Sequence, residues 1–183
     1  MARHTVGWKR LDSERLHLGP VVSLRRDRVV RPDGSTGVYE HVVVHDMVRI
    51  VALDSRRRHV LLVEDDFYLQ GCRMLHLPGG GTDGEAPEAA AQRELTEETG
   101  FVADRIAPLA TLDLLPGVTA ARLHLFAATG LTPSRDTVRR DATEAGLTVA
   151  WWPLEEAVAA ASTGRITDAG SVSGLLLAVK ERR

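Results

Sequence analysis

Cysteine is almost absent from this chain of 183 residues, in which Cys72 stands alone. A single cysteine excludes a disulfide framework within the chain and a zinc site built from several thiolates. Aromatic residues are also scarce, at 4% of the chain. Each aromatic side chain is therefore as readily explained by packing as by stacking on a ligand.

No apolar run approaches the length of about 18 residues that a membrane span needs. Residues 1–10 contain no apolar segment of the kind found in signal peptides, so a soluble, cytoplasmic protein is expected. The 23 basic and 25 acidic residues give a net charge of −2. Such a balance argues against nucleic-acid binding through a broad basic surface.

The chain is long enough for one domain with a sizeable core. Its patterning predicts strands over 20–30, 38–45, 48–54, 59–64, 107–115, 122–128 and 147–152. It predicts helices over 86–99, 154–161 and 170–180. The first two strands are expected to form a hairpin around residues 31–34, and the next two a second pair, with a loop beginning at Asp65. This order indicates a mixed α/β layered fold rather than a doubly wound sheet.

Three carboxylates share one face of the predicted helix 86–99. Glu94 is separated from Glu97 by three positions and from Glu98 by four, so the like charges repel one another. A divalent cation would offset that repulsion, and carboxylate oxygens suit Mg²⁺ or Mn²⁺ better than zinc. The alternative interpretation is a solvated acidic helix face.

A run of glycines, 79–81, precedes this helix. Glycine lets the backbone approach a ligand closely, and the carbonyl of Gly79 is a candidate metal ligand. Glu85 lies eight residues before Arg93, so the two are expected to pair and hold the loop against the helix.

Taken together, these residues form a recognisable pattern. Gly79, five residues, Glu85, seven residues and then Arg93-Glu94-Leu95-Thr96-Glu97-Glu98-Thr99-Gly100-Phe101 resemble the box of the Nudix hydrolase superfamily. The loop appears one residue shorter than the common one when it is counted from Pro78-Gly79-Gly80.

The resemblance implies an α/β/α sandwich with a mixed sheet, and hydrolysis of nucleoside diphosphates linked to another group. It implies that Glu94, Glu97 and Glu98 are metal-binding and catalytic residues. Gly79 would supply a carbonyl ligand, and Glu85 with Arg93 would form the structural pair of the box. The implied cofactor is Mg²⁺ or Mn²⁺, which neutralises the diphosphate and activates a water molecule.

Most of the chain is similar to ADP-ribose pyrophosphatase-like members of this superfamily. The similarity includes residues 18–45, 60–63 and 75–78, and Pro116 occupies the position of a proline in that subfamily. The resemblance implies a homodimer formed through residues 1–45, a region of antiparallel strands, followed by a hydrolase domain at 46–183. A sheet confined to one chain is the alternative for residues 1–45.

Two departures from the subfamily bear on specificity and catalysis. A basic segment usually follows the strand equivalent to 60–63, whereas Glu64, Asp65 and Asp66 stand here and would repel a terminal phosphate. The subfamily often places a catalytic glutamate in a later loop. Glu144 is the candidate and Asp141 the next, with Glu97 as the alternative for positioning water.

The predicted function is Mg²⁺-dependent cleavage of ADP-ribose or a related nucleoside diphosphate sugar. The alternatives are a Nudix hydrolase of a nucleoside triphosphate or dinucleotide, and a Nudix domain that senses a nucleotide sugar without cleaving it. The candidate substrate-binding residues, from strands and loops outside the box, are Arg26, Arg28, Phe67, Tyr68 and Pro116.

Overall fold

The computed structural model describes residues 7–135 and 146–180. These residues form two compact units. Unit 1 contains residues 7–45 and 113–122, and unit 2 contains the rest of the described chain. The predicted division at residue 45 into a dimerisation region and a hydrolase domain stays a prediction.

Unit 1 is built on one antiparallel sheet of β1 (Lys9–Leu18), β2 (Ser23–Val30) and β3 (Thr36–Val43), in that order. The predicted hairpin between β2 and β3 is confirmed. Its turn is closed by Arg31 N–H donating to the Ser35 carbonyl at 2.8 Å, and Gly34 takes a φ of +84°. The sequence did not predict β1, because its register shifts near Arg10 and Arg15 interrupt the two-residue alternation that marks a strand.

Unit 2 contains two sheets of three strands each. One has the order β4 (Met47–Ala52), β8 (Arg122–Pro133) and β7 (Phe101–Asp113), with β4 and β8 parallel. The other has the order β6 (Cys72–His76), β5 (His59–Phe67) and β9 (Thr148–Pro153), and both of its pairings are antiparallel.

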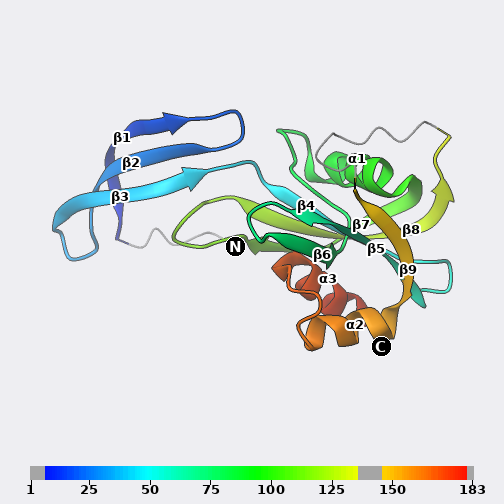
Figure 1. Cartoon of the computed structure of the whole chain (residues 1–183). Coiled ribbons are helices and arrows are strands. Elements are labelled where there is room, and N and C mark those ends of the chain that lie inside the picture. The colour runs from blue at the N-terminus through cyan, green and yellow to red at the C-terminus, as the bar shows by residue number, and fades with distance from the viewer. Residues whose placement is uncertain (1–6, 136–145, 181–183) are drawn as a thin grey trace. The chain divides into compact units, whose positions relative to one another are not determined.

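Helices cover both sides of these sheets. Within unit 2, α1 (Pro87–Thr99) lies on one side, and α2 (Leu154–Ser162) and α3 (Ala169–Lys180) lie on the other (Figure 1). Two apolar clusters correspond to these two interfaces, one including Leu95 of α1 and the other including Leu154 of α2 and Leu175 of α3. The predicted mixed α/β sandwich is therefore confirmed.

Strand β4 separates the two clusters by the alternation of its side chains. Val48 and Ile50 pack with α1, whereas Val51 packs with the cluster of α2 and α3. Arg49 belongs to this buried strand and is only 6% exposed. A charged side chain at such a position needs partners inside the protein.

Three expectations about strands were wrong. β4 and β5 are joined by an isolated bridge between Leu53 and Val60 rather than as a strand pair, because β8 pairs with β4 while β6 and β9 flank β5. β5 continues through Asp65 to Phe67, since its acidic end is paired with β6. β7 begins at Phe101, directly after the glycine that ends α1.

None of the helices among the described residues is long and apolar enough to cross a membrane.

Candidate active site

Helix α1 carries the three predicted carboxylates, and its ends follow from the sequence. Pro87 lies in the first turn, where its missing N–H costs no hydrogen bond. Gly100 ends the helix with a φ of +74° and donates its N–H to the Thr96 carbonyl at 2.9 Å. Glu94 and Glu98 are buried with 7% and 5% exposure, on the helix side that also buries Leu95.

The glycine loop lies against these carboxylates because it has no side chains to hold it away. A Cβ on Gly80 would lie 2.7 Å from Oε1 of Glu94. Gly79 has a φ of +141°, and a Cβ there would lie 2.2 Å from the Val48 carbonyl oxygen. The N–H of Gly79 donates to Oε2 of Glu98 at 2.7 Å. Both positions therefore require glycine for close approach.

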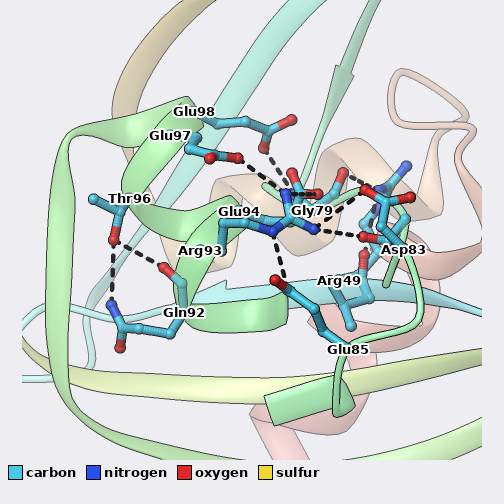
Figure 2. Close-up of polar contacts among 12 residues, drawn as sticks. Arg49, Gly79, Asp83, Glu85, Gln92, Arg93, Glu94, Thr96, Glu97 and Glu98 are labelled. Carbon is cyan, nitrogen blue, oxygen red and sulfur yellow. Dashed lines mark hydrogen bonds and ion pairs between the residues drawn. The ribbon is translucent and has the colours of Figure 1, made fainter. Parts of the chain in front are cut away.

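Arg93 joins the helix to the loop (Figure 2). Its Nε donates to Oε2 of Glu85 at 3.1 Å, so the structure brings together the two residues predicted to pair. Its Nη1 donates to Oε1 of Glu94 at 2.8 Å and to Oε2 of Glu97 at 3.0 Å. Its Nη2 donates to the Gly81 carbonyl at 2.8 Å.

These contacts set the charge state of the site. Burial disfavours the charged guanidinium, but hydrogen bonding to Glu85 and the attraction of Glu94 outweigh it and raise the pKa of Arg93 above its ordinary value. Arg93 therefore stays a cation and offsets part of the repulsion among the helix carboxylates, the role that the sequence assigned to a metal ion.

The carbonyl of Gly79 has a protein partner that the sequence did not reveal. Nη1 of Arg49 donates to it, and Nε of Arg49 pairs with Oδ2 of Asp168 at 3.1 Å. Asp168 precedes α3 and accepts the N–H of Ser171 at 2.8 Å, as a helix N-cap does. An arginine within an otherwise apolar strand was the signal that the sequence offered. The role of Gly79 as a metal ligand stays a prediction.

The chemistry of the donor set fits a hard divalent cation. Glu94, Glu97 and Glu98 offer carboxylate oxygens, and the glycine loop closes on Glu94 and Glu98. Within residues 7–135 and 146–180, no three histidine, cysteine or acidic side chains converge as a ready-made metal site. Glu94 and Glu97 instead hold Arg93, so a metal ion would share these oxygens with its guanidinium.

The other predicted site residues lie in different surroundings. Phe67 ends β5 and packs edge-on against the His76 ring, with centroids 5.2 Å apart, while Tyr68 is 96% exposed in the following turn. Arg26 and Arg28 belong to β2, and Pro116 belongs to the same unit 1. Glu144 lies outside the described residues.

The two arginines of β2 are engaged within their own sheet. Arg26 pairs with Glu40 at 2.7 Å. Arg28 pairs with Asp12, and both arginines remain substantially exposed. Their contact with substrate stays a prediction. To bind a phosphate, each arginine would have to break its ion pair or share its guanidinium between the carboxylate and the phosphate.

The acidic end of β5 is partly neutralised by Arg73 of β6. Arg73 pairs with Asp66 at 3.2 Å and with Glu64 at 3.6 Å, and it also donates to the Gly146 carbonyl at 3.1 Å. Within the described part of the chain, Glu64 and Asp66 therefore share the charge of Arg73. This part of the sheet is not a basic phosphate-binding surface.

His76 is a buried histidine that the sequence analysis did not single out. Its Nδ1 lies 2.9 Å from the Leu77 carbonyl, and its Nε2 is buried with no hydrogen-bond partner among the described residues. Burial, followed by repulsion from Arg49, lowers the pKa of His76 below its ordinary value of 6.5. The ring is therefore neutral at pH 7, and its Nδ1 donates to the carbonyl.

A loss of stability on acidification is expected from this histidine. The unfolded chain binds the proton near pH 6.5 and the folded chain binds it only at lower pH. The contribution is therefore fully present above pH 6.5 and is lost as the pH falls through the lowered pKa. Urea unfolding at about pH 7.5 and about pH 5 should show a smaller loss of unfolding free energy on acidification for His76→Gln than for the unaltered protein. An equal loss in both would contradict the prediction.

Comparison of the chain with known protein families agrees with this geometry. Residues 44–172 match the NUDIX domain, and residues 8–42 match the nucleoside diphosphate sugar hydrolase N-terminal domain. The chain therefore belongs to the Nudix family of hydrolases, which act on phosphorus anhydrides.

One relative and one solved structure match nearly the whole chain. An ADP-ribose pyrophosphatase of Mycobacterium tuberculosis is 35% identical over 180 residues, which are 96% of this chain and 84% of that protein. An ADP-sugar pyrophosphatase of Mus musculus is 31% identical over 69% of this chain and 62% of that protein. The solved structure of an ADP compounds hydrolase matches with a TM-score of 0.80 at 22% identity, covering 99% of this chain and 96% of that one, and it supports the fold.

Proposed function

We propose that the protein is a Mg²⁺-dependent pyrophosphohydrolase that cleaves ADP-ribose or a related nucleoside diphosphate sugar in the cytoplasm. The observation that carries the proposal is the joining of the box carboxylates to the glycine loop, where Gly79 N–H holds Glu98 and Arg93 holds Glu94 and Glu97. The similarity to an ADP-ribose pyrophosphatase over 96% of the chain supports the substrate class.

The three glutamates of α1 would hold the metal ion. Mg²⁺ bound there supplies Lewis-acid chemistry, neutralising diphosphate oxygens and making a water molecule a stronger nucleophile. Glu98 is fixed by the Gly79 N–H, and Glu94 is enclosed by the glycine loop, so both carboxylates are held before substrate arrives. Such fixed charges cost little reorganisation during the reaction.

Proton removal from the water needs a further carboxylate. We assign it to Glu144, with Glu97 as the alternative. Glu97 has a side chain that is 41% exposed, so a water molecule can reach its carboxylate. In that alternative, Glu94 and Glu98 would hold the metal ion while Glu97 would activate the water molecule.

A panel of substrates tests the proposal directly. The protein is incubated in excess Mg²⁺ with ADP-ribose, nucleotide sugars, dinucleoside polyphosphates and nucleoside triphosphates, and the products are identified by mass. Conversion of ADP-ribose to AMP and ribose 5-phosphate as the preferred reaction is expected. Turnover of none of these compounds, with binding retained, would favour the nucleotide-sugar sensor.

The acidic end of β5 supports a second candidate within the same family. Glu64 and Asp66 share the charge of Arg73, which leaves net negative charge on this surface. Such a surface disfavours substrates with a terminal phosphate near it. A preference in the panel for a dinucleotide, whose phosphates are all internal, would establish this alternative, whereas the same surface disfavours a nucleoside triphosphate.

We also propose that the protein is a homodimer that associates through the sheet of unit 1. Leu18 and Val43 flank Ser23 in register, so their side chains share one face of this sheet, and they are 65% and 43% exposed. Exposed apolar side chains of this kind are typical of an interface. A three-stranded sheet also gains stability from a covering partner.

Sedimentation analysis is expected to show a dimer for the unaltered protein and a shift toward monomer for Leu18→Glu/Val43→Glu. The two added charges would be desolvated in the interface without a partner. The exposed Arg56, in the turn after β4, provides the control Arg56→Glu, which should remain dimeric. A monomeric unaltered protein would contradict the proposal.

A further inference from the structure

We propose that the ion pair of the buried Arg49 with Asp168 is a positioning device that fixes the Gly79 peptide and, through it, Glu98. The inference rests on the proposed function, since it assigns Glu98 to the metal site. Arg49 comes from β4 and Asp168 precedes α3, so the device joins the helix layer opposite α1 to the glycine loop.

Arg49 is held at both ends of its guanidinium. Its Nε donates to Oδ2 of Asp168 at 3.1 Å, and its Nη1 donates to the carbonyl oxygen of Gly79. The side chain is 7% exposed, so water does not substitute for either contact. Figure 2 shows Arg49 and Gly79 within the group of polar contacts that also includes Arg93.

Asp168 is itself fixed by α3. Its Oδ2 accepts the N–H of Ser171 at 2.8 Å and the Ser171 hydroxyl at 2.6 Å. The hydroxyl oxygen accepts the N–H of Leu77 at 2.8 Å, two residues before Gly79. The start of α3 therefore holds the loop at Leu77 directly and at Gly79 through Arg49.

Two glycines of α3 allow Arg49 and Leu77 to lie close to the helix. A Cβ on Gly170 would lie 2.9 Å from Cγ of Arg49, and a Cβ on Gly174 would lie 2.8 Å from Cδ1 of Leu77. These glycines, one helical turn apart, allow the arginine stem and the leucine to lie against the helix. An alanine at either position would push one of them away from the loop.

The device acts on the loop residue that touches a predicted ligand. The carbonyl of Gly79 is bound by Arg49 and its N–H is bound by Glu98, so both polar groups of one residue are fixed. Freeing the carbonyl lets the loop rotate, which weakens the hold on the Glu98 carboxylate. A residue that orients a ligand in this way typically affects metal affinity or activity by about 10- to 100-fold.

A pair of matched variants separates positioning from stability. Arg49→Met leaves the half-buried Asp168 without its cation, so a loss of folding stability is expected whatever the role of the pair. Arg49→Met/Asp168→Asn removes both charges and keeps an amide oxygen for Ser171. The double variant is expected to recover most of the thermal stability but not the hydrogen bond to Gly79.

Three measurements are made on the unaltered protein, the double variant and the surface control Arg56→Met. They are Mn²⁺ affinity by electron paramagnetic resonance, hydrogen exchange of the segment 77–81, and kcat with KM for ADP-ribose. The double variant is expected to bind Mn²⁺ about 10- to 100-fold more weakly, to exchange faster in this segment, and to lose kcat more than KM.

The outcomes distinguish the two proposals. Unchanged Mn²⁺ affinity and unchanged exchange in a stable double variant would overturn the role of Arg49. If the unaltered protein neither binds Mn²⁺ nor cleaves a substrate, the proposed function fails. The exchange measurement then still decides whether the pair fixes the loop.

Discussion

Glu98→Gln is expected to lower kcat for ADP-ribose by about a thousandfold, since charge stabilisation by a bound metal is worth several kcal/mol and each 1.36 kcal/mol is a factor of ten. Glu98 is 5% exposed and accepts the Gly79 N–H at 2.7 Å. The amide oxygen of glutamine still accepts that hydrogen bond, whereas the negative charge is lost. The substitution therefore tests the charge of Glu98 with little change in shape.

Glu88→Gln is the matched control, because Glu88 lies on the first turn of the same helix and is exposed. It should keep kcat within about twofold, in line with the small effects of surface substitutions. Mn²⁺ affinity and thermal unfolding are measured on both variants. Retained turnover in Glu98→Gln would remove this residue from the predicted metal site, and a lost fold in that variant would be seen in the unfolding curve.

The box of this site was predictable because its chemistry is local in sequence. Glycines at 79–81, a helix that ends at Gly100, and the pairing of Glu85 with Arg93 all follow from spacing along one segment. The structure adds that Arg93 also holds Glu94 and Glu97. Spacing along the helix does not distinguish this arginine from a metal ion as the counter-charge.

The support behind the loop was not predictable in the same way. Arg49 and Asp168 are 119 residues apart, and only the packing of α3 on β4 brings them together. An acidic residue just before a helix is typical of an N-cap, which accounts for the contact of Asp168 with Ser171 but not for its contact with Arg49. Local patterns report neighbours along the chain, so a buried pair between distant elements escapes them.

The strand pairing failed for a related reason. Sequential strands are often neighbours, which favoured a pair of β4 with β5. Strand β4 instead pairs in parallel with β8, in which Phe126 lies opposite Ile50. Val48, Ile50 and Phe126 then belong to the apolar cluster under α1, although β8 comes much later in the chain than β4. Hydrophobic alternation marks the strands and the faces they bury, but not their partners.

Arg93→Met is expected to destabilise the protein by about 2–3 kcal/mol in the absence of divalent metal. The Glu94 side chain is 9% exposed and loses its cation in a buried setting. Glu97, Glu85 and Asp83 are more exposed, at 41%, 45% and 71%, so water compensates much of their loss. The estimate therefore lies below the cost of breaking a fully buried pair.

Mg²⁺ should reduce this deficit if the carboxylates around Arg93 bind metal. A ligand that binds only the folded state stabilises it, and the variant lacks the guanidinium that shares Oε1 of Glu94 and Oε2 of Glu97 with the ion. The free energy of unfolding is measured by urea titration in EDTA and in excess Mg²⁺, with Arg105→Met of β7 as an exposed control.

The free energy of unfolding of Arg93→Lys should lie between those of the unaltered protein and Arg93→Met, because lysine keeps the charge but loses the planar fork. A variant as stable as the unaltered protein in EDTA would show that Arg93 does not offset the carboxylate repulsion. A deficit unaffected by Mg²⁺ would count against metal binding by Glu94 and Glu97.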